Sequence, residues 1–194
     1  MNQAAEGIGA APETGDDRLA AELDRLGLRI LLGARADPDR EPLRPTDFLA
    51  GLAGSSDARL RSATIWVLLW RPDYASAAHA AALRLSGQAR VMFRCYYTAA
   101  VLLSGRYRTR LEALRGQIVD LPDLFSVALG VHGVGRSDER LGELAARHAD
   151  LSGEPINWLG TYENAASALL RFAELNALYV RRKVALNIDS HETP

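Results

Sequence analysis

Apolar residues recur every three to four positions along most of the chain, and no segment alternates apolar and polar residues as a half-buried β-strand does. Two segments, 57–70 and 88–103, are apolar almost all round, which is typical of helices that are buried on several sides. They align at an offset of 31 residues, and each is followed by a shorter, more polar helix. The pattern predicts an all-α single domain, built either as HEAT- or TPR-like stacked helical hairpins or as an irregular helix bundle.

The N-terminal region divides into an arm and two helices. Residues 1–13 are small and aperiodic, which predicts a disordered arm before a helical domain at 14–184. Thr14 and the acids after it predict a helix start, and the apolar face of that helix is expected to continue through Leu32. Thr46 is expected to cap a short helix that Gly54 ends.

Prolines, glycines and capping side chains set the remaining helix boundaries. The last helix has apolar positions at helical spacing, which we interpret as its buried face: Ala165, Leu169, Phe172, Leu175 and Tyr179. A mobile tail is expected at 185–194. The other predicted boundaries are Ser56 and Asp57 at the start of the first buried helix, Pro72 at a helix start and Gly87 at its end, Pro122 at another start, Ser137 and Asp138 as caps, a break at Gly153 and Pro155, and a last helix from Asn157 or Thr161 to about Lys183.

The composition narrows the function classes. Apolar residues make up 48% and charged residues 24%, as in an ordinary globular protein, and the net charge of −1 gives no overall attraction to nucleic acid or anionic lipid. Lys183 is the only lysine, so 22 of the 23 basic residues are arginines. With the many alanines, this indicates the bias of a GC-rich genome, so local arginine density is weak evidence of function.

Cysteine content and the N-terminal sequence bear on location. Cys95 is the only cysteine, so no intrachain disulfide can form. The first residues have neither the basic nor the apolar region of a signal peptide, and the apolar stretches are too short to span a membrane. We therefore expect a soluble, cytoplasmic protein without a membrane partner.

Motifs for catalysis are weak or missing from the sequence. Gly54 and Ser55 could suggest a nucleotidyltransferase phosphate loop, but no strand precedes them and no carboxylate pair follows. Helical RNases of the HEPN type pair Arg and His more closely than this chain does, because both of its Arg–His pairs have seven residues between them. We predict no catalytic residues, no cofactor site and an interaction protein rather than an enzyme.

The histidines and carboxylates do not have the spacing of metal ligands. The sequence contains no HExxH motif and no cysteine cluster, and Glu143 and His148 lack the Glu-x-x-His spacing of di-iron helices. His79 lies among alanines, where a histidine is more often a packed or partly exposed helix residue than a base. No metal site is predicted.

One arginine lies inside an apolar run. Arg94 falls within "VMFRCYYTAAVLL", with Arg90 one turn earlier and Tyr97 one turn later. A buried guanidinium needs a partner, because stranding it costs about 3 to 5 kcal/mol. We expect Arg94 to pair with Asp123 or Glu163. The alternatives are a side chain that reaches the surface and a ligand-binding arginine.

The segment "NWLGTYENA" introduces the last helix. Trp158 and Tyr162 are four residues apart and so share a face, which predicts that they anchor the helix inside the protein. Gly160 marks either a close approach of another backbone or a break before a cap at Thr161. Trp and Tyr are also preferred anchors of interfaces, so a binding surface that includes Glu163 and Asn164 is the alternative.

Two short motifs carry a resemblance to a known family. "LPDLFSVALGV" and the later "INWLGTYENA" resemble small bacterial helical proteins that pair an LPDxFS segment with an NWxxxYE segment. The resemblance covers roughly residues 56 to 172. It implies an accessory or antitoxin-like role beside a minimal nucleotidyltransferase-like protein, and it carries no active-site residues to this chain.

We therefore predict a non-enzymatic protein–protein interaction module with an aromatic and arginine-bearing groove. The alternative is a nucleic-acid-associated component that holds phosphates on an arginine-bearing helical face. The sequence also leaves a homodimer as a possible assembly. A helical enzyme that uses Arg94 is the third hypothesis. The candidate partner-binding residues are Arg90, Arg94, Tyr97, Asp123, Trp158, Tyr162, Glu163 and Asn164.

Overall fold

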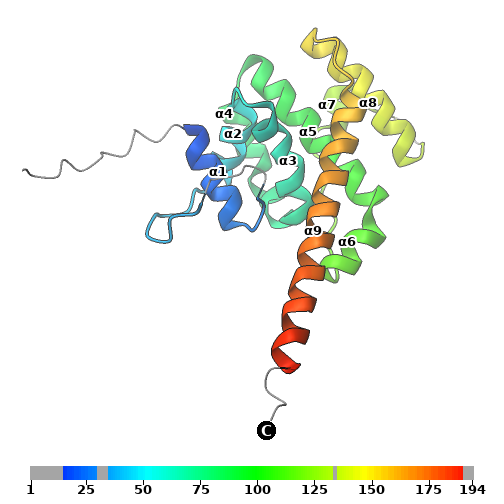
Figure 1. Ribbon diagram of the computed structural model, residues 1–194. Coiled ribbons are helices and arrows are strands. Elements are labelled where there is room, and N and C mark those ends of the chain that lie inside the picture. The colour runs from blue at the N-terminus through cyan, green and yellow to red at the C-terminus, as the bar shows by residue number, and fades with distance from the viewer. Residues whose placement is uncertain (1–14, 30–34, 133–134, 190–194) are drawn as a thin grey trace, which may run out of the picture.

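A computed structural model describes residues 15–29, 35–132 and 135–189, with the backbone alone for 184–189. All regular elements in these residues are helical (Figure 1). They are α1 (Gly15–Arg25), α2 (Pro45–Gly54), α3 (Ala58–Trp70), the 3-10 helix η1 (Pro72–Ala77), α4 (Ala78–Arg84), α5 (Gly87–Arg106), α6 (Arg108–Arg115), α7 (Ser126–Leu129), α8 (Ser137–Ser152) and α9 (Trp158–Asp189).

Helix α5 lies at the centre of the fold. It packs against α2, α3, α4, α6, α7, α8 and α9. In a solenoid each repeat contacts only its neighbours, so the arrangement is the irregular bundle and not the HEAT- or TPR-like stack. The apolar character of α3 and α5 all round fits this position, because residues on every side of both helices are buried.

The long helix α9 crosses the bundle and continues beyond it (Figure 1). Its first half packs against α3, α5 and α8, and α6 also contacts it. The helix reaches Asp189, six residues beyond the predicted end at Lys183. The arm predicted at 1–13 lies outside the described part of the chain, and so do residues 190–194 of the predicted tail.

Several predicted helix boundaries agree with the structure. Asp57 caps α3, and its side chain accepts a hydrogen bond from the Arg59 amide. Gly153 has the left-handed conformation that ends α8 (φ 66°), as expected for a glycine after the last helical turn. Pro72 lies in the first turn of η1, where its missing amide costs nothing.

Other boundaries were predicted wrongly. Helix α1 ends at Arg25 rather than near Leu32, because the chain turns at Gly27 (φ 76°), after which Leu28 packs into the core. Gly87 begins α5 instead of ending the preceding helix. Pro122 does not begin a helix, since it lies in an irregular segment before α7.

Two predicted caps are also displaced. The N-cap of α2 is Arg44 and not Thr46, so the helix begins two residues earlier than expected, at Pro45. Ser137 is the first residue of α8, and its N-cap is Arg136. In both helices the residue predicted as the cap is the hydroxyl residue nearest to the helix start. The observed N-cap is instead an arginine, whose backbone is extended and whose side chain makes no capping hydrogen bond.

Candidate functional site

Asn157 begins α9. Its Oδ1 accepts a hydrogen bond from the Gly160 amide at 2.9 Å, the pattern of an N-cap residue. A Cβ at Gly160 would come within 2.8 Å of Asn157 Nδ2, so the glycine leaves room for the capping side chain. Asn157 is therefore the start that the sequence offered as one of two alternatives. Thr161 lies inside the helix, where its hydroxyl donates to the Asn157 carbonyl at 3.0 Å.

Four aromatic rings hold the first turns of α9 against α5 and α8. Trp158 and Tyr162 are buried, as predicted for helix anchors. His148 of α8 stacks on Trp158, with ring centroids 3.6 Å apart, and its Nδ1 lies 2.6 Å from the Tyr162 hydroxyl oxygen. Tyr96 of α5 contacts all three rings edge-on, at 5.9 to 6.4 Å. We call these four residues the aromatic cluster.

The aromatic cluster is uncharged at neutral pH. Burial lowers the pKa of His148 to about 4. Burial also raises the pKa of Tyr96 to about 12 and that of Tyr162 still higher. The neighbouring Cys95 thiol is buried, which raises its pKa to about 12. Near neutral pH the two tyrosines and the cysteine keep their protons, and the histidine ring stays uncharged. The cluster is therefore suited to packing and not to proton transfer at that pH.

The LPDLFS segment also packs on α5, where it contacts Tyr97, the residue after Tyr96. The Tyr97 hydroxyl donates to the Pro122 carbonyl at 2.9 Å, and the Tyr97 and Phe125 rings are 5.1 Å apart. Consecutive helical residues point about 100° apart, so Tyr96 and Tyr97 contact two different segments. The two segments that carry the family resemblance therefore both pack on α5, and their aromatic residues serve the fold.

The predicted ion pair of Arg94 is wrong. Arg94 is half-buried and lies over the Phe125 ring, 5.7 Å from its centroid, and among the described residues no carboxylate pairs with it. Asp123 instead accepts hydrogen bonds from the Ser126 amide and from Arg140, each at 3.1 Å. The apolar run around Arg94 gave no sign that Phe125, just before α7, would offer it an aromatic ring instead of a carboxylate.

Glu163 and Arg90 do not join the other candidates. Glu163 forms an ion pair with Arg106 at 2.6 Å, on the side of α9 that faces the end of α5. Arg90 is exposed near the start of α5. The eight candidates therefore do not form one groove. Tyr97, Arg94 and Asp123 lie around the LPDLFS segment, and Trp158, Tyr162 and Asn164 lie at the start of α9.

A groove of about 450 Å³ runs between α3 and the first half of α9. Trp66, Tyr96 and Trp158 supply its aromatic surface, and Asn164 lies on its edge. The complete lining is Ala58, Arg59, Arg61, Ser62, Trp66, Tyr96, Ile156, Trp158, Thr161, Asn164, Ala165 and Ala168.

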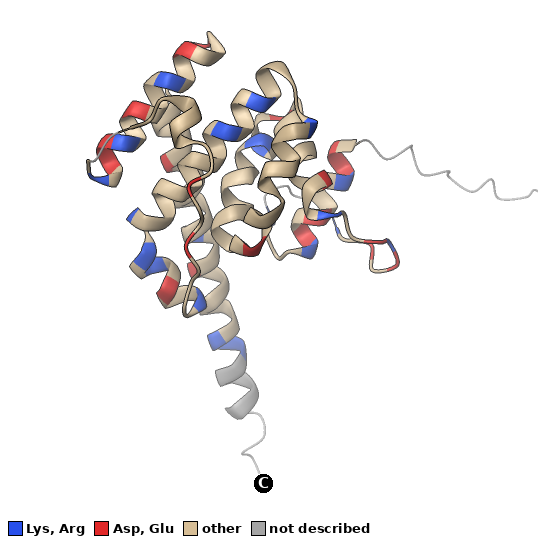
Figure 2. Cartoon of the chain, turned by 180° about the vertical axis from the view of Figure 1, so that it is seen from behind, with Lys and Arg blue, Asp and Glu red and all other residues tan. Residues whose placement is uncertain are grey.

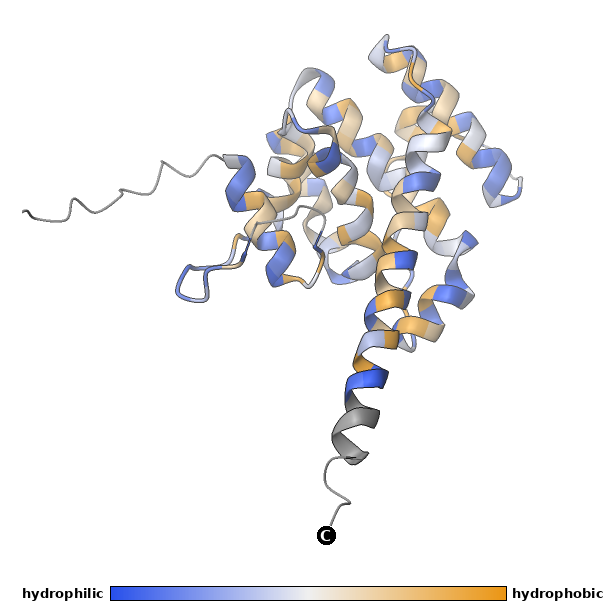
Figure 3. Cartoon of the chain, in the orientation of Figure 1, coloured by the Kyte–Doolittle hydropathy of each residue, from blue (hydrophilic) through white to orange (hydrophobic). Residues whose placement is uncertain are grey.

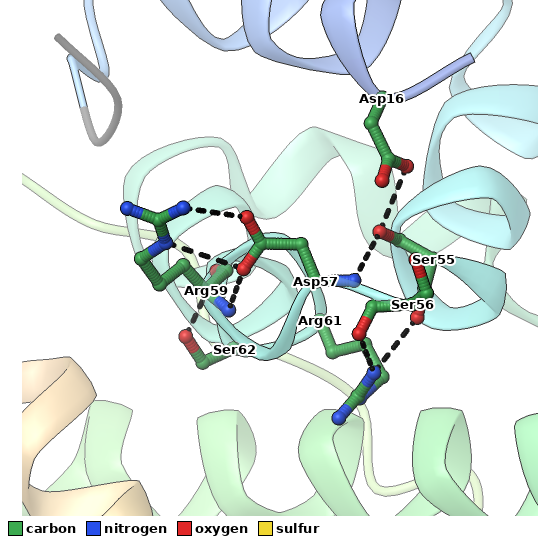
Figure 4. A network of polar contacts seen from close by, with 7 residues as sticks. All are labelled: Asp16, Ser55, Ser56, Asp57, Arg59, Arg61 and Ser62. Atoms are coloured by element: carbon green, nitrogen blue, oxygen red, sulfur yellow. Dashed lines mark hydrogen bonds and ion pairs between the residues drawn. The ribbon is translucent and has the colours of Figure 1, made fainter. Parts of the chain in front are cut away.

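The two arginines of the groove have different partners (Figure 4). The Arg59 guanidinium binds the Asp57 carboxylate at 2.9 Å, and this hydrogen bond holds the pKa of Asp57 below its usual value. The Arg61 guanidinium donates to the carbonyls of Ser55 and Ser56, at 2.9 and 2.8 Å. These backbone contacts position Arg61 without neutralising its charge. Sequence reasoning missed both arginines because they lie among many others.

Beyond the groove, α9 carries several more hydrophobic residues (Figure 3). Phe172 follows the groove and packs on Trp66, with ring centroids 5.9 Å apart. Leu175, Leu178 and Tyr179 come next, with 60%, 61% and 67% of their surface exposed. We call these three residues the α9 stripe. The sequence predicted Leu175 and Tyr179 to be buried, but α9 extends past the helices that would cover them.

The described residues contain no group of three or more His, Cys, Asp and Glu side chains that could hold a metal ion. Within the same residues, no helix combines the length and apolar content required to cross a membrane. Comparison with known proteins found no matching family model, curated protein or solved structure.

Proposed function

We propose that this protein is a non-enzymatic interaction module, an accessory or regulatory subunit that binds another protein. The observation that supports the proposal best is the continuous face of α9, which begins as the wall of the groove and ends as the α9 stripe. Exposed leucine and tyrosine side chains at helical spacing are typical of surfaces that a partner covers.

The chemistry of the interior also favours binding over catalysis. Around the aromatic cluster the buried titratable groups are His148, Cys95, Tyr96 and Tyr162, and burial keeps each of them neutral near pH 7. A general acid or base works best when its pKa lies near the working pH, and these groups are shifted away from it. The groove is lined mainly by aromatic and small apolar side chains.

The resemblance of the LPDLFS and NWLGTYE segments extends the proposal to the partner. It implies a minimal nucleotidyltransferase-like protein as that partner and an antitoxin-like role in the bacterial cytoplasm. Both segments pack on α5 in this chain, which supports a role for them in positioning α9.

The nucleic-acid alternative has less support. Most described arginines outside α9 are engaged with carboxylates, and residues of both charges are interspersed along the helices of the bundle (Figure 2). Arginines in such ion pairs contribute little to phosphate binding. The pairs include Arg71–Asp73, Arg84–Asp47, Arg106–Glu163, Arg108–Asp120, Arg110–Glu174 and Arg140–Asp123.

Site-specific photo-crosslinking tests the proposal. Benzoylphenylalanine in place of Ala168, an exposed residue of the groove, should capture one protein in the source cells. The same group in place of Ala80, exposed on α4, is the control and should not capture it. The captured protein should bind the purified chain, and Leu175→Ser should weaken that binding. A chain that gives equal crosslinks from both positions, or none, would refute the interaction function.

A further inference from the structure

We infer that the groove and the α9 stripe together bind an acidic amphipathic helix of the partner protein, packed as in a coiled coil. This inference rests on the interaction function proposed above and names the chemistry of the partner.

The spacing on α9 favours a helix as the occupant. Along the side of α9 that lines the groove and carries the stripe, apolar and small residues recur at alternating intervals of four and three. An alternation of this kind keeps one line of side chains facing a partner helix, as in a heptad repeat. The positions are Thr161, Ala165, Ala168, Phe172, Leu175 and Tyr179.

The side chains along this line of α9 are small at the groove end and large at the stripe end. The groove end carries alanines, which let another helix approach closely, and its walls are the large rings of Trp66 and Trp158. The stripe end carries Leu175 and Tyr179, which project beyond the bundle. A partner helix would therefore place large apolar residues in the groove and pack side by side with α9 along the stripe.

The charges beside the stripe favour an acidic partner. Arg171 and Arg182 are eleven residues apart, about three helical turns, so they lie on the same side of α9 as the stripe, one turn before Leu175 and one turn after Tyr179, and Lys183 follows. All three are exposed, and none has an ion pair with a described side chain. Glu174 does not offset them, because it points toward α6 and binds Arg110 at 2.6 Å.

Charge also argues against a second copy of α9 as the occupant. A parallel pair places Arg171, Arg182 and Lys183 beside themselves. An antiparallel pair centred between Leu175 and Tyr179 places Arg171 beside Lys183. Like charges that flank a coiled-coil seam disfavour pairing, and glutamates at those positions favour it.

Binding of designed peptides to the full chain tests the inference. The probes are two labelled peptides of about three heptads, with leucine at the core positions and either glutamate or lysine at the flanking positions. Fluorescence anisotropy should show the glutamate peptide bound at least about tenfold more tightly than the lysine peptide, with weaker binding at high salt. Absence of glutamate-peptide binding at concentrations up to on the order of 100 μM would overturn the inference.

Substitutions locate the site. Leu175→Ser with Tyr179→Ser should weaken the glutamate peptide at least about tenfold, while Leu83→Ser, at a leucine 69% exposed on α4, should not. Arg182→Glu with Lys183→Glu should also weaken it about tenfold. The matched control, Arg90→Glu with Arg136→Glu, changes the net charge equally at two exposed arginines elsewhere and should leave binding unchanged.

The remaining outcomes separate the alternatives. Equal binding of both peptides through the stripe overturns the acidic partner and leaves the interaction function standing. A dimer in sedimentation velocity that the Leu175→Ser and Tyr179→Ser pair abolishes assigns the surface to a second copy. Tight binding of a labelled RNA or DNA of about 20 nucleotides, lost with Arg182→Glu and Lys183→Glu but not with the stripe variant, assigns it to nucleic acid.

Discussion

Protonation of His148 should destabilise the fold at mildly acidic pH. The ring is fully buried between Trp158, Tyr162 and Tyr96, and among the described residues no carboxylate contacts it. Its Nδ1 faces the Tyr162 hydroxyl, and its Nε2 is buried without a hydrogen-bond partner. Adding a proton would therefore place a positive charge and an unsatisfied N–H among aromatic rings.

The magnitude follows from the shift of the histidine pKa. Burial lowers the pKa of His148 from 6.5 to about 4, so the unfolded chain binds more protons than the folded one between these values. The stabilising effect of the neutral ring is complete above pH 6.5 and is lost as the pH falls toward 4. At about 1.4 kcal/mol for each pH unit, the loss amounts to about 3 kcal/mol.

Urea unfolding at constant ionic strength, followed by tryptophan fluorescence from pH 7 to pH 4, measures this loss. The aspartates whose pKa values are lowered, Asp24, Asp57, Asp73 and Asp123, lose their stabilising contribution mainly below about pH 4, so they affect only the acidic end of the window.

A substitution isolates the histidine from other titrating groups. His148→Gln should lower stability at pH 7 but should make it nearly constant between pH 6.5 and 4. His132→Gln, at an exposed histidine, should keep the wild-type pH dependence. If the wild type were equally stable at pH 6.5 and 4, or if His148→Gln kept the full loss, the reasoning from burial would be refuted.

Three further changes test the fold and the site. Trp158→Ala should lower the free energy of unfolding by about 3 to 5 kcal/mol, because it leaves a cavity beside His148. Asn164→Ala, at the exposed edge of the groove, should change it by at most about 0.5 kcal/mol. Equal effects of the two substitutions in urea unfolding would contradict this placement. Asp57→Ala removes the cap of α3 and should cost about 1 kcal/mol by the same assay, and an unchanged midpoint would contradict a stabilising cap. The Cys95 thiol, buried with a pKa of about 12, should react with a thiol reagent only as fast as the protein unfolds, and rapid labelling of the native chain would show that it is accessible.

Helix type and burial of the central helices follow from local pattern alone. The all-round apolar character of residues 57–70 and 88–103 predicts helices surrounded by others, and α3 and α5 are such helices. Spacing of four residues is enough to place Trp158 and Tyr162 on one face, because the geometry of a helix is set by its own backbone. Capping by Asp57 is likewise local, since donor and acceptor are two residues apart.

Contacts between distant segments depended on the tertiary structure. The stacking of His148 on Trp158, the ring that Phe125 offers to Arg94 and the pairing of Asp123 with Arg140 each join segments whose separation in sequence carries no geometric information. The periodicity of α9 identifies one apolar face but does not show where the bundle ends. Leu175 and Tyr179 have the spacing of core residues, yet they are exposed because α3 ends at Trp70 and α9 continues past it. A hydrophobic pattern shows which side of a helix avoids water, whereas the lengths and positions of the neighbouring helices decide whether that side is covered.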